Sequence, residues 1–243
     1  MSVTDLLKTD DDIQGEEDRL GGGGLFDSDI YDAKVTMAYL GESKGGAISL
    51  NVHFEIDGRT LRQTFWMTSG KEKGQKNYYI NKNDEKRYLP GFNMANALSL
   101  LTVAKEIGNL DAPESKVINL WDFEQSKEVP TEVPVYTQLL NETVRLGVIR
   151  QIVDKTAKQD NGSYAPTGET REENEVDKMF RARDNKTTTE IRAKADATFH
   201  DKWLEKNQGE VRNKASGEAA SGGVSTGKPS TASSKPTESL FED

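Results

Sequence analysis

Cysteine is absent from this chain, which excludes disulfide bonds and thiolate metal sites. Histidine is scarce, and the wide separation of His53 and His200 favours two unrelated residues over a two-histidine metal site. No apolar run approaches the roughly 20 residues that a membrane-spanning helix needs. The N-terminus also lacks the basic and apolar regions of a secretory signal. We therefore expect an intracellular protein with no membrane partner.

Motifs of common enzyme sites are absent too. The phosphate loop G-x-x-x-x-G-K-[ST] does not occur, and the four glycines at 21–24 lack both the lysine and the flanking strand of such a loop. No nucleophile motif is present. The sequence thus predicts a protein that is not an enzyme and that holds no cofactor or metal ion.

Charge is plentiful but unevenly distributed. The formal net charge is −9, and seven acidic against two basic residues give positions 1–20 a local charge of −5. Glycines occupy positions 21–24, so we expect residues 1–25 to form a flexible acidic arm. Residues 215–243 are rich in Gly, Ser, Thr, Lys and Pro and are predicted to be disordered.

Residues 58–90 reverse this balance. Eight basic and three acidic side chains give the segment a local charge of +5, and five aromatic residues are interleaved with the cations: Phe65, Trp66, Tyr78, Tyr79 and Tyr88. Cations follow a phosphate backbone while flat rings stack on unpaired bases, so this mixture is typical of a groove for single-stranded nucleic acid. The alternative is a solvated charged loop whose aromatic residues turn into the core.

Alternating apolar residues predict a three-stranded meander that enters this segment. Every second residue is apolar or aromatic at 31–39 and 48–56, which is the period of a half-buried strand. Asp57-Gly58 is then a strong hairpin signal. In the third strand Arg62 and Trp66 fall on the solvent face, where core packing does not explain a tryptophan. Base stacking is one explanation; incidental exposure, or packing under a loop or against another subunit, is the alternative. Such a meander opens an OB-type barrel, whose strands 2 and 3 form the usual binding face.

The rest of the chain predicts one helix, further strands and a helical extension. A helix is expected at 93–107, where apolar residues recur every three or four positions. Strands or extended segments are expected at 117–123, 133–140 and 144–155. The last of these should carry a bulge near Gly147, where the alternation slips. The C-terminal part predicts a short helix or ordered connector at 170–181 and helices at 187–195 and 198–208.

Several stretches resemble bacteriophage single-stranded DNA-binding proteins with an OB fold. They are the meander, the basic-aromatic segment and the blocks GVIRQIVDKT (147–156), PTGETREENEVDKMF (166–180) and FHDKWLEKNQGEVRNKA (199–215). The resemblance covers residues 25–215 approximately and implies a protein that coats unwound strands in phage DNA replication, recombination and repair. It also implies residence in the cytoplasm of the infected bacterial host.

In this family a disordered C-terminal tail recruits replication proteins such as polymerase or helicase. The end of this chain, Leu240, Phe241, Glu242 and Asp243, offers two apolar residues beside acids and is the predicted partner-binding peptide. The tail departs from the family pattern, because three lysines against four acidic residues from position 214 onward leave a charge of only −1. An arbitrary terminus is the alternative interpretation.

The predicted fold is mainly β: an OB-like, curved, five-stranded barrel with a capping helix, a small helical C-terminal extension and disordered termini. Residues 26–160 form the nucleic-acid-binding domain and 161–214 the partly helical extension, between the arm and the tail. An oligomer is compatible with this organisation.

The predicted function is single-stranded DNA binding with little sequence preference. The candidate DNA-binding residues are Arg59, Arg62, Trp66, Lys71, Lys73, Lys76, Tyr78, Tyr79, Lys82, Arg87, Tyr88, Arg145 and Arg150. The first alternative is a protein-interaction or virion structural module on the same barrel, with the aromatic residues as its binding patch. The second is a nuclease with magnesium at the acidic run 169–177, although that run is more typical of a solvated helix face.

Overall fold

The computed structural model describes residues 24–122, 125–159 and 164–216. The acidic arm at 1–25 and the tail at 215–243 lie almost entirely outside these residues, and so does the predicted partner-binding peptide. The described residues divide into two compact units, one within Met1–Gln151 and Glu172–Arg212 and the other within Ile152–Arg171 and Asn213–Asp243. The fold is mainly β, as predicted, with a large antiparallel sheet and few helices.

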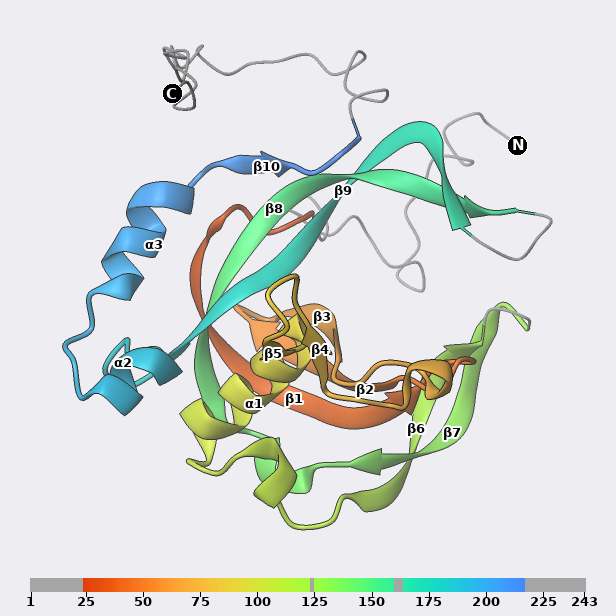
Figure 1. Cartoon of the computed structure of the whole chain (residues 1–243), viewed down its shortest axis with the longest axis horizontal. Helices are drawn as coiled ribbons and strands as arrows, with labels where there is room; N and C mark the ends of the chain where they lie inside the picture. The colour runs from red at the N-terminus through yellow and green to blue at the C-terminus, as the bar shows by residue number, and fades with distance from the viewer. Residues whose placement is uncertain (1–23, 123–124, 160–163, 217–243) are drawn as a thin grey trace, which may run out of the picture. The chain divides into compact units, whose positions relative to one another are not determined.

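The predicted meander is present and forms one side of the sheet, with β3 as its last strand. β1 (Asp29–Glu42), β2 (Ile48–Ile56) and β3 (Arg59–Trp66) are consecutive antiparallel neighbours (Figure 1). Asp57 and Gly58 join β2 to β3 with positive φ angles of 48° and 74°, as a tight hairpin turn requires. Leu50 pairs with Phe65 and Phe54 with Leu61, and these residues form part of the buried core.

Three more strands extend this sheet. β8 (Thr143–Lys158) pairs with the first part of β1, β9 (Tyr164–Arg181) pairs with β8, and β10 (Val211–Asn213) lies at the edge of the order β10-β8-β1-β2-β3. The long β1 therefore changes partner along its length: its residues from Asp29 to Lys34 pair with β8, and those from Lys34 to Glu42 pair with β2.

No ladder closes the sheet into a barrel among the described strands, because β3 pairs only with β2. A side chain spans the opening instead. Gln63 Oε1 accepts a hydrogen bond from the Val176 N–H at 3.0 Å, and Gln63 Nε2 donates to the Asn174 carbonyl at 3.3 Å. The Asn174 side chain in turn binds both the N–H and the carbonyl of Phe26, at 2.8 and 2.7 Å. One glutamine thus connects β3 to β9.

A helix covers one end of the core. α1 (Pro90–Thr102) begins with a proline, which suits the first helical position because its missing N–H would have no partner there. It buries Leu98 and Leu101 and is shorter than the predicted helix at 93–107, since Ala104 takes a positive φ of 58°. A 3-10 turn, Ile107–Asn109, follows.

An additional hairpin lies between α1 and β8. β6 (Glu114–Asp122) pairs with β7 (Lys127–Val135) over their full lengths, and Val135 also pairs with Tyr39 of β1 (Figure 1). The segments predicted at 117–123 and 133–140 fall on this hairpin and on a following 3-10 turn, Thr137–Leu139.

Two expectations about β8 and β9 are wrong. Residues 170–181 are neither helix nor connector but strand β9, because β8 provides a partner for them and Val176, Met179 and Phe180 are buried. Gly147 carries no bulge, since β8 pairs with β1 there without a register shift. A Cβ at Gly147 would lie 2.9 Å from the ring of Trp203, so the glycine allows that ring to approach. Both faces of β8 are covered here, so consecutive residues such as Val148 and Ile149 are buried and the sequence loses its alternation of apolar and polar residues.

The helices predicted at 187–195 and 198–208 are present, whereas residues 164–181 of the predicted extension belong to β9. α2 (Thr188–Ala193) and α3 (Phe199–Asn207) are linked by the buried carboxylate of Glu190. It accepts backbone N–H bonds from Thr187 at 2.9 Å and from Thr198 and Phe199 at 2.8 Å. Burial alone would raise the pKa of Glu190, but these donors outweigh it and lower the pKa to about 2.

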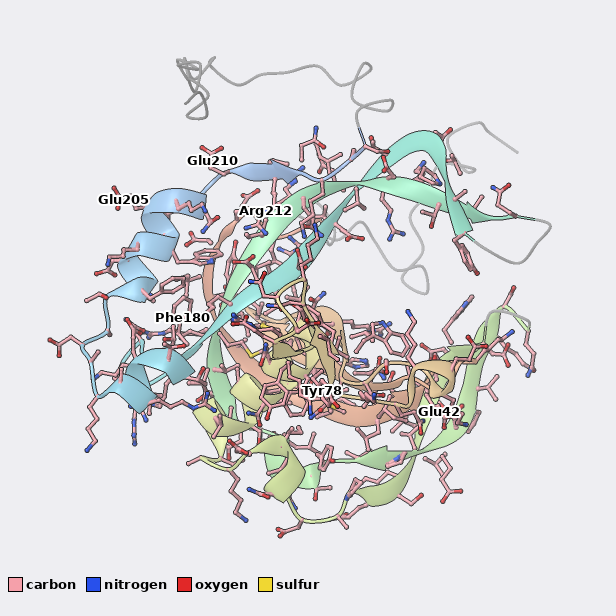
Figure 2. The ribbon with its side chains drawn as sticks, viewed as in Figure 1. Glu42, Tyr78, Phe180, Glu205, Glu210 and Arg212 are labelled. Atoms are coloured by element: carbon pink, nitrogen blue, oxygen red, sulfur yellow. The ribbon has the colours of Figure 1, made fainter. Side chains whose placement is uncertain are left out.

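A tryptophan fixes α3 to the sheet. Trp203 is buried with Phe180 and Ile149, and its Nε1 donates to Asp177 at 2.8 Å. Asp177 also binds Arg212 at 2.9 Å; Phe180 and Arg212 are labelled in Figure 2. Phe180 and Trp203 form a small second core that is distinct from the main one.

The second unit contains the outer parts of β8 and β9. Lys155 pairs with Glu169 at 2.9 Å, and Asp154 accepts bonds from the N–H and hydroxyl of Ser216 at 3.0 and 2.7 Å. The side-chain and backbone bonds from Ser216 lower the pKa of Asp154. No helix in the described part of the chain is long and apolar enough to cross a membrane.

Candidate nucleic-acid interface

The outward side of β2 and β3 carries both an aromatic residue and a cation. Cross-strand pairing places Ser49 opposite Trp66 and His53 opposite Arg62, with the outward pair of Asn51 and Thr64 between them, while Leu50 and Phe65 face the core. Because side chains alternate along a strand, Arg62 and Trp66 share the outward side. The ring of Trp66 is 46% exposed, so the prediction that it avoids the core is confirmed.

β1 adds a second aromatic residue to this side. Tyr39 pairs with Asn51, and its ring lies edge-on to His53 with centroids 6.0 Å apart. The half-buried position raises the pKa of Tyr39 and lowers that of His53, and Arg62 lowers the His53 pKa further. The lowered pKa of His53 favours its neutral form, so Arg62 is the cation that the described β2 and β3 present on this side, where Glu55 is also exposed.

Sequence alternation assigned Tyr39 to the core, and this was wrong. The pairing of β1 with β2 shifts between Val35 and Met37, so one extra residue stands in β1. Val35 before the shift and Ala38 after it both face the core, whereas Met37 and Tyr39 turn outward. Nothing in the alternation alone marks this bulge, because apolar residues occupy both sides of the strand beyond it.

The position of Trp66 is fixed by its backbone. A Cβ on Gly91, in the first turn of α1, would lie 2.2 Å from the Trp66 carbonyl oxygen, so only glycine permits this contact. On the other side, the N–H of Met67 donates to the Ile48 carbonyl at 2.8 Å. The end of β3 is thus held from two directions while its indole ring stays exposed.

The chain after β3 forms a flap, defined as residues 77–89. β4 (Tyr78–Ile80) and β5 (Lys86–Tyr88) pair as a short hairpin, and the Leu89 N–H donates to the Asn77 carbonyl at 2.9 Å (Figure 1). The residues leading into the flap bind the β1–β2 turn. The Lys71 N–H donates to Gly45, and the Lys71 ammonium pairs with Glu42 at 2.9 Å.

Aromatic rings and cations alternate on the flap. Tyr79 and Tyr88 are 48% and 57% exposed, and Tyr78, labelled in Figure 2, is half-buried. The ammonium groups of Lys86 and Lys76 lie 5.0 and 5.9 Å from the centre of the Tyr78 ring. These distances allow a cation–π attraction.

Three predicted DNA-binding arginines are held elsewhere. Arg59 stacks on the Phe26 ring at 3.9 Å, and Arg145 pairs with Asp32 at 2.6 Å. Arg150 binds Glu172 at 2.6 Å and Asp27 at 3.3 Å, which raises the pKa of its guanidinium. The structure does not bring these three arginines to the surface that carries Trp66.

The remaining cations differ in how free they are. Lys71 pairs with Glu42, and Arg87 with Glu85 at 2.7 Å. Apart from Arg59, the cations of residues 58–90 without a carboxylate partner among the described residues are Arg62, Lys73, Lys76, Lys82 and Lys86. Sequence reasoning omitted Tyr39, His53, Asn77 and Lys86 from the site; Lys86 stood in the basic segment and could have been included on composition alone.

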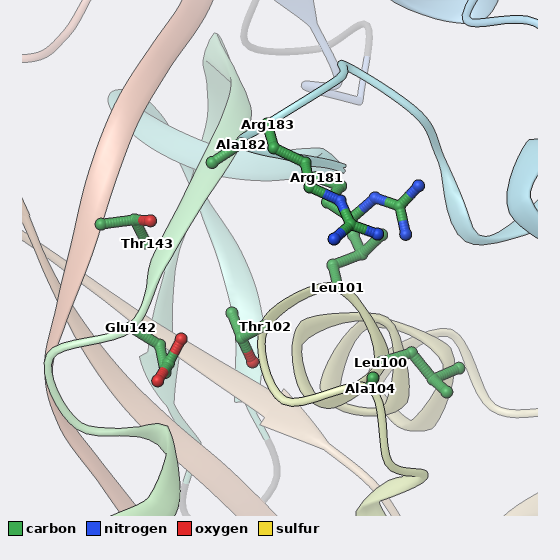
Figure 3. A pocket seen from close by; sticks show the side chains of 9 residues that line it. All are labelled: Leu100, Leu101, Thr102, Ala104, Glu142, Thr143, Arg181, Ala182 and Arg183. Carbon is green, nitrogen blue, oxygen red and sulfur yellow. The ribbon is translucent and has the colours of Figure 1, made fainter.

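A hollow at the end of α1 is a separate feature (Figure 3). Leu100, Leu101 and Thr102 line it together with the side chains of Glu142 and Arg181. Arg181 Nε donates to Asp184 at 2.9 Å, and that hydrogen bond raises the pKa of Arg181. The charge of Arg181 is therefore satisfied within the fold, and the described residues that line the hollow include no aromatic ring on which a base could stack.

The acidic run considered for magnesium also has internal partners. Glu172 binds Arg150, and Asp177 binds Arg212 and Trp203. Within the described residues, no group of three or more His, Asp or Glu side chains is placed to hold a metal ion. No family model, no curated protein and no solved structure matches this chain.

Proposed function

We propose that this protein binds single-stranded DNA with little sequence preference, along the outward side of β2 and β3 and the adjoining flap. The observation that carries the proposal is Trp66, an exposed indole on a fixed backbone, on the same side of β3 as Arg62, which has no carboxylate partner in the described chain. Rings stack on bases of any sequence, and cations without protein partners are available to phosphates.

The arrangement of the sheet supports an OB-type fold. β1, β2, β3, β8 and β9 would be the five strands, with α1 between the third and the fourth. The contact through Gln63 stands where the first three strands approach the fifth. In an OB fold the face of strands 2 and 3 is the usual binding surface, which is where Trp66 and Arg62 lie.

The resemblance noted in the sequence suggests where such an activity acts. We propose a role in phage DNA replication, recombination and repair, in the cytoplasm of an infected bacterium. The terminal Leu240–Asp243 peptide, which lies outside the described residues, would recruit a replication protein. No catalytic step is part of this proposal.

The test is a titration of fluorescein-labelled oligo-dT, read by anisotropy. Trp66→Ala should weaken binding by about tenfold or more, since a stacked base contributes about 1–3 kcal/mol. Trp121→Ala is the matched control, because Trp121 is similarly exposed, at 53%, but lies on the β6–β7 hairpin. Equal affinity of the Trp66 variant and the wild type would remove the proposed site.

A second candidate function, protein binding, is favoured by the β6–β7 hairpin. Trp121 and Val117 are exposed on one side of it, and their cross-strand partners on that side are Glu128 and Glu132. Carboxylates beside the rings disfavour a phosphate backbone and suit a basic protein surface. If Trp121→Ala weakened oligo-dT binding as much as Trp66→Ala, the hairpin would belong to the DNA site instead.

A further inference from the structure

One side of the flap encloses a hollow of about 420 Å³ lined by Asn77, Tyr78, Lys86 and Tyr88. The hairpin register explains why Tyr78, Lys86 and Tyr88 are grouped, while Asn77 borders the hollow from the position just before β4. Tyr78 pairs with Tyr88, and Lys86 pairs with Ile80, so these residues share a side. Tyr79 and Arg87 form the pair between them and lie on the opposite side.

Tyr88 gives the hollow a supported stacking surface. Its ring packs against Phe92 of α1 with centroids 4.9 Å apart and an interplanar angle of 31°. Phe92 itself packs against the main core, so it limits the movement of Tyr88. Since Tyr88 is still 57% exposed, its ring remains accessible to a flat ligand.

Polar groups at the edge of the hollow are free to bind a ligand. The Asn77 side-chain amide makes no hydrogen bond to any described residue, although its backbone carbonyl is used by Leu89. The Lys86 ammonium has no carboxylate partner in the described chain and lies near the Tyr78 ring. On the opposite side of the hairpin, by contrast, Arg87 is neutralised by Glu85.

We propose that this hollow binds a single nucleobase with an exocyclic oxygen, thymine or guanine above all, and disfavours adenine. The inference rests on the proposed function and specifies the chemistry of one position along the strand. The base would stack on Tyr88, and Lys86 and the Asn77 amide would donate to its carbonyl oxygen. Adenine is the one DNA base without such an oxygen, and its exocyclic amino group is a donor that would face these donors.

The consequence is a mild base preference on an otherwise sequence-tolerant surface. A net hydrogen bond changes affinity by about two- to tenfold, which is much less than the effect of losing the whole site. The preference should therefore appear as a ratio of dissociation constants, adenine oligomer over thymine oligomer, and not as an absolute requirement.

The experiment measures this ratio for the full chain with labelled oligo-dT and oligo-dA of equal length at one salt concentration. Lys86→Met and Asn77→Ala should each lower the ratio by about two- to tenfold. The controls are Lys82→Met and Asn83→Ala, which remove the same groups in the hairpin turn, outside the hollow. They should leave the ratio at the wild-type value. Adenine bases also stack on one another within free oligo-dA, which changes its affinity for every variant by the same factor. This factor cancels when the ratios of the variants are compared.

The outcomes separate this inference from the proposed function. Tight oligo-dT binding with an unchanged ratio in both hollow variants would overturn the base site and leave the proposed function standing. Absence of binding to either oligomer in the wild type would overturn both. Thermal unfolding of each variant verifies folding, which we expect to be unaffected because Lys86 is exposed and the Asn77 side chain has no partner in the described chain.

Discussion

Arg62 on β3 and Arg150 on β8 carry the same group, but only Arg62 leaves its charge available. Arg62 lies across the strand pair from His53, which is neutral near pH 7. Arg150 instead meets Glu172 of β9 at 2.6 Å and Asp27 at 3.3 Å. The comparison indicates that Arg62 is a candidate ligand for phosphate because it forms no ion pair with a described carboxylate, whereas Arg150 forms two.

The tryptophans show the same contrast. Trp203 is 3% exposed, lies on Gly147 and donates its N–H to Asp177. Trp66 is 46% exposed, and Gly91 contacts only its backbone. A close glycine thus serves two purposes: it admits the ring of Trp203 into the fold, and it anchors the main chain of Trp66 while the ring remains free.

The largest expected effect is on stability, and it comes from a buried charge whose partners all lie within the fold, that of Glu190. Glu190→Gln removes the charge that receives three backbone N–H groups, so it should lower the free energy of unfolding by about 2 kcal/mol at neutral pH. Glu205→Gln, an exposed change on α3, is the control. Urea unfolding measures both variants, and oligo-dT affinity should stay at the wild-type value in both.

The same substitution has a defined pH dependence. The pKa of Glu190 is lowered from 4.5 to about 2, so its stabilisation is present above the ordinary pKa and is lost as the pH falls through the folded one. The difference between wild type and Glu190→Gln should therefore shrink between these two values. A difference that persists at the acid end would contradict the assignment of the effect to this carboxylate.

A smaller effect tests the two arginines directly. Arg62→Met should weaken oligo-dT binding by about tenfold and leave the unfolding free energy unchanged. Arg150→Met should lower the unfolding free energy by about 1 kcal/mol, since its pairs are partly solvated, and leave the affinity unchanged. Anisotropy titrations and urea unfolding of both variants give the four values. If both variants lost the same oligo-dT affinity, Arg150 would bind DNA in spite of its ion pairs.

Local pattern was sufficient to predict the meander and the direction of Trp66. Both depend on a period of two that runs from Ile48 to Trp66 with one hairpin turn, so they need no knowledge of distant residues. The fixed backbone of Trp66 was not predictable, because the contact with Gly91 depends on how α1 packs.

Features that need a distant partner could not be predicted. The acidic and basic residues of β9 suggested a solvated helix, and only the pairing with β8 makes them a strand. Three arginines, Arg59, Arg145 and Arg150, were predicted to bind DNA from their charge alone. Their partners Phe26, Asp32 and Glu172 are distant in sequence and are visible only in the fold. Tyr39 faces outward instead of toward the core because of a bulge in β1, and nothing in the sequence pattern indicates that bulge.

The salt dependence of oligo-dT binding by the wild type tests the central claim most directly, namely that internal ion pairs decide which cations reach DNA. Arg62, Lys73, Lys76, Lys82 and Lys86 lie on β3, on the flap or between them and have no carboxylate partner in the described chain. If each neutralises a phosphate, log K should fall with log salt at a slope of about −3.5, from about −0.7 per contact. The nine cations in the site predicted from sequence would give about −6. A slope near −3.5 supports the account, whereas a slope near −6, or no binding, contradicts it.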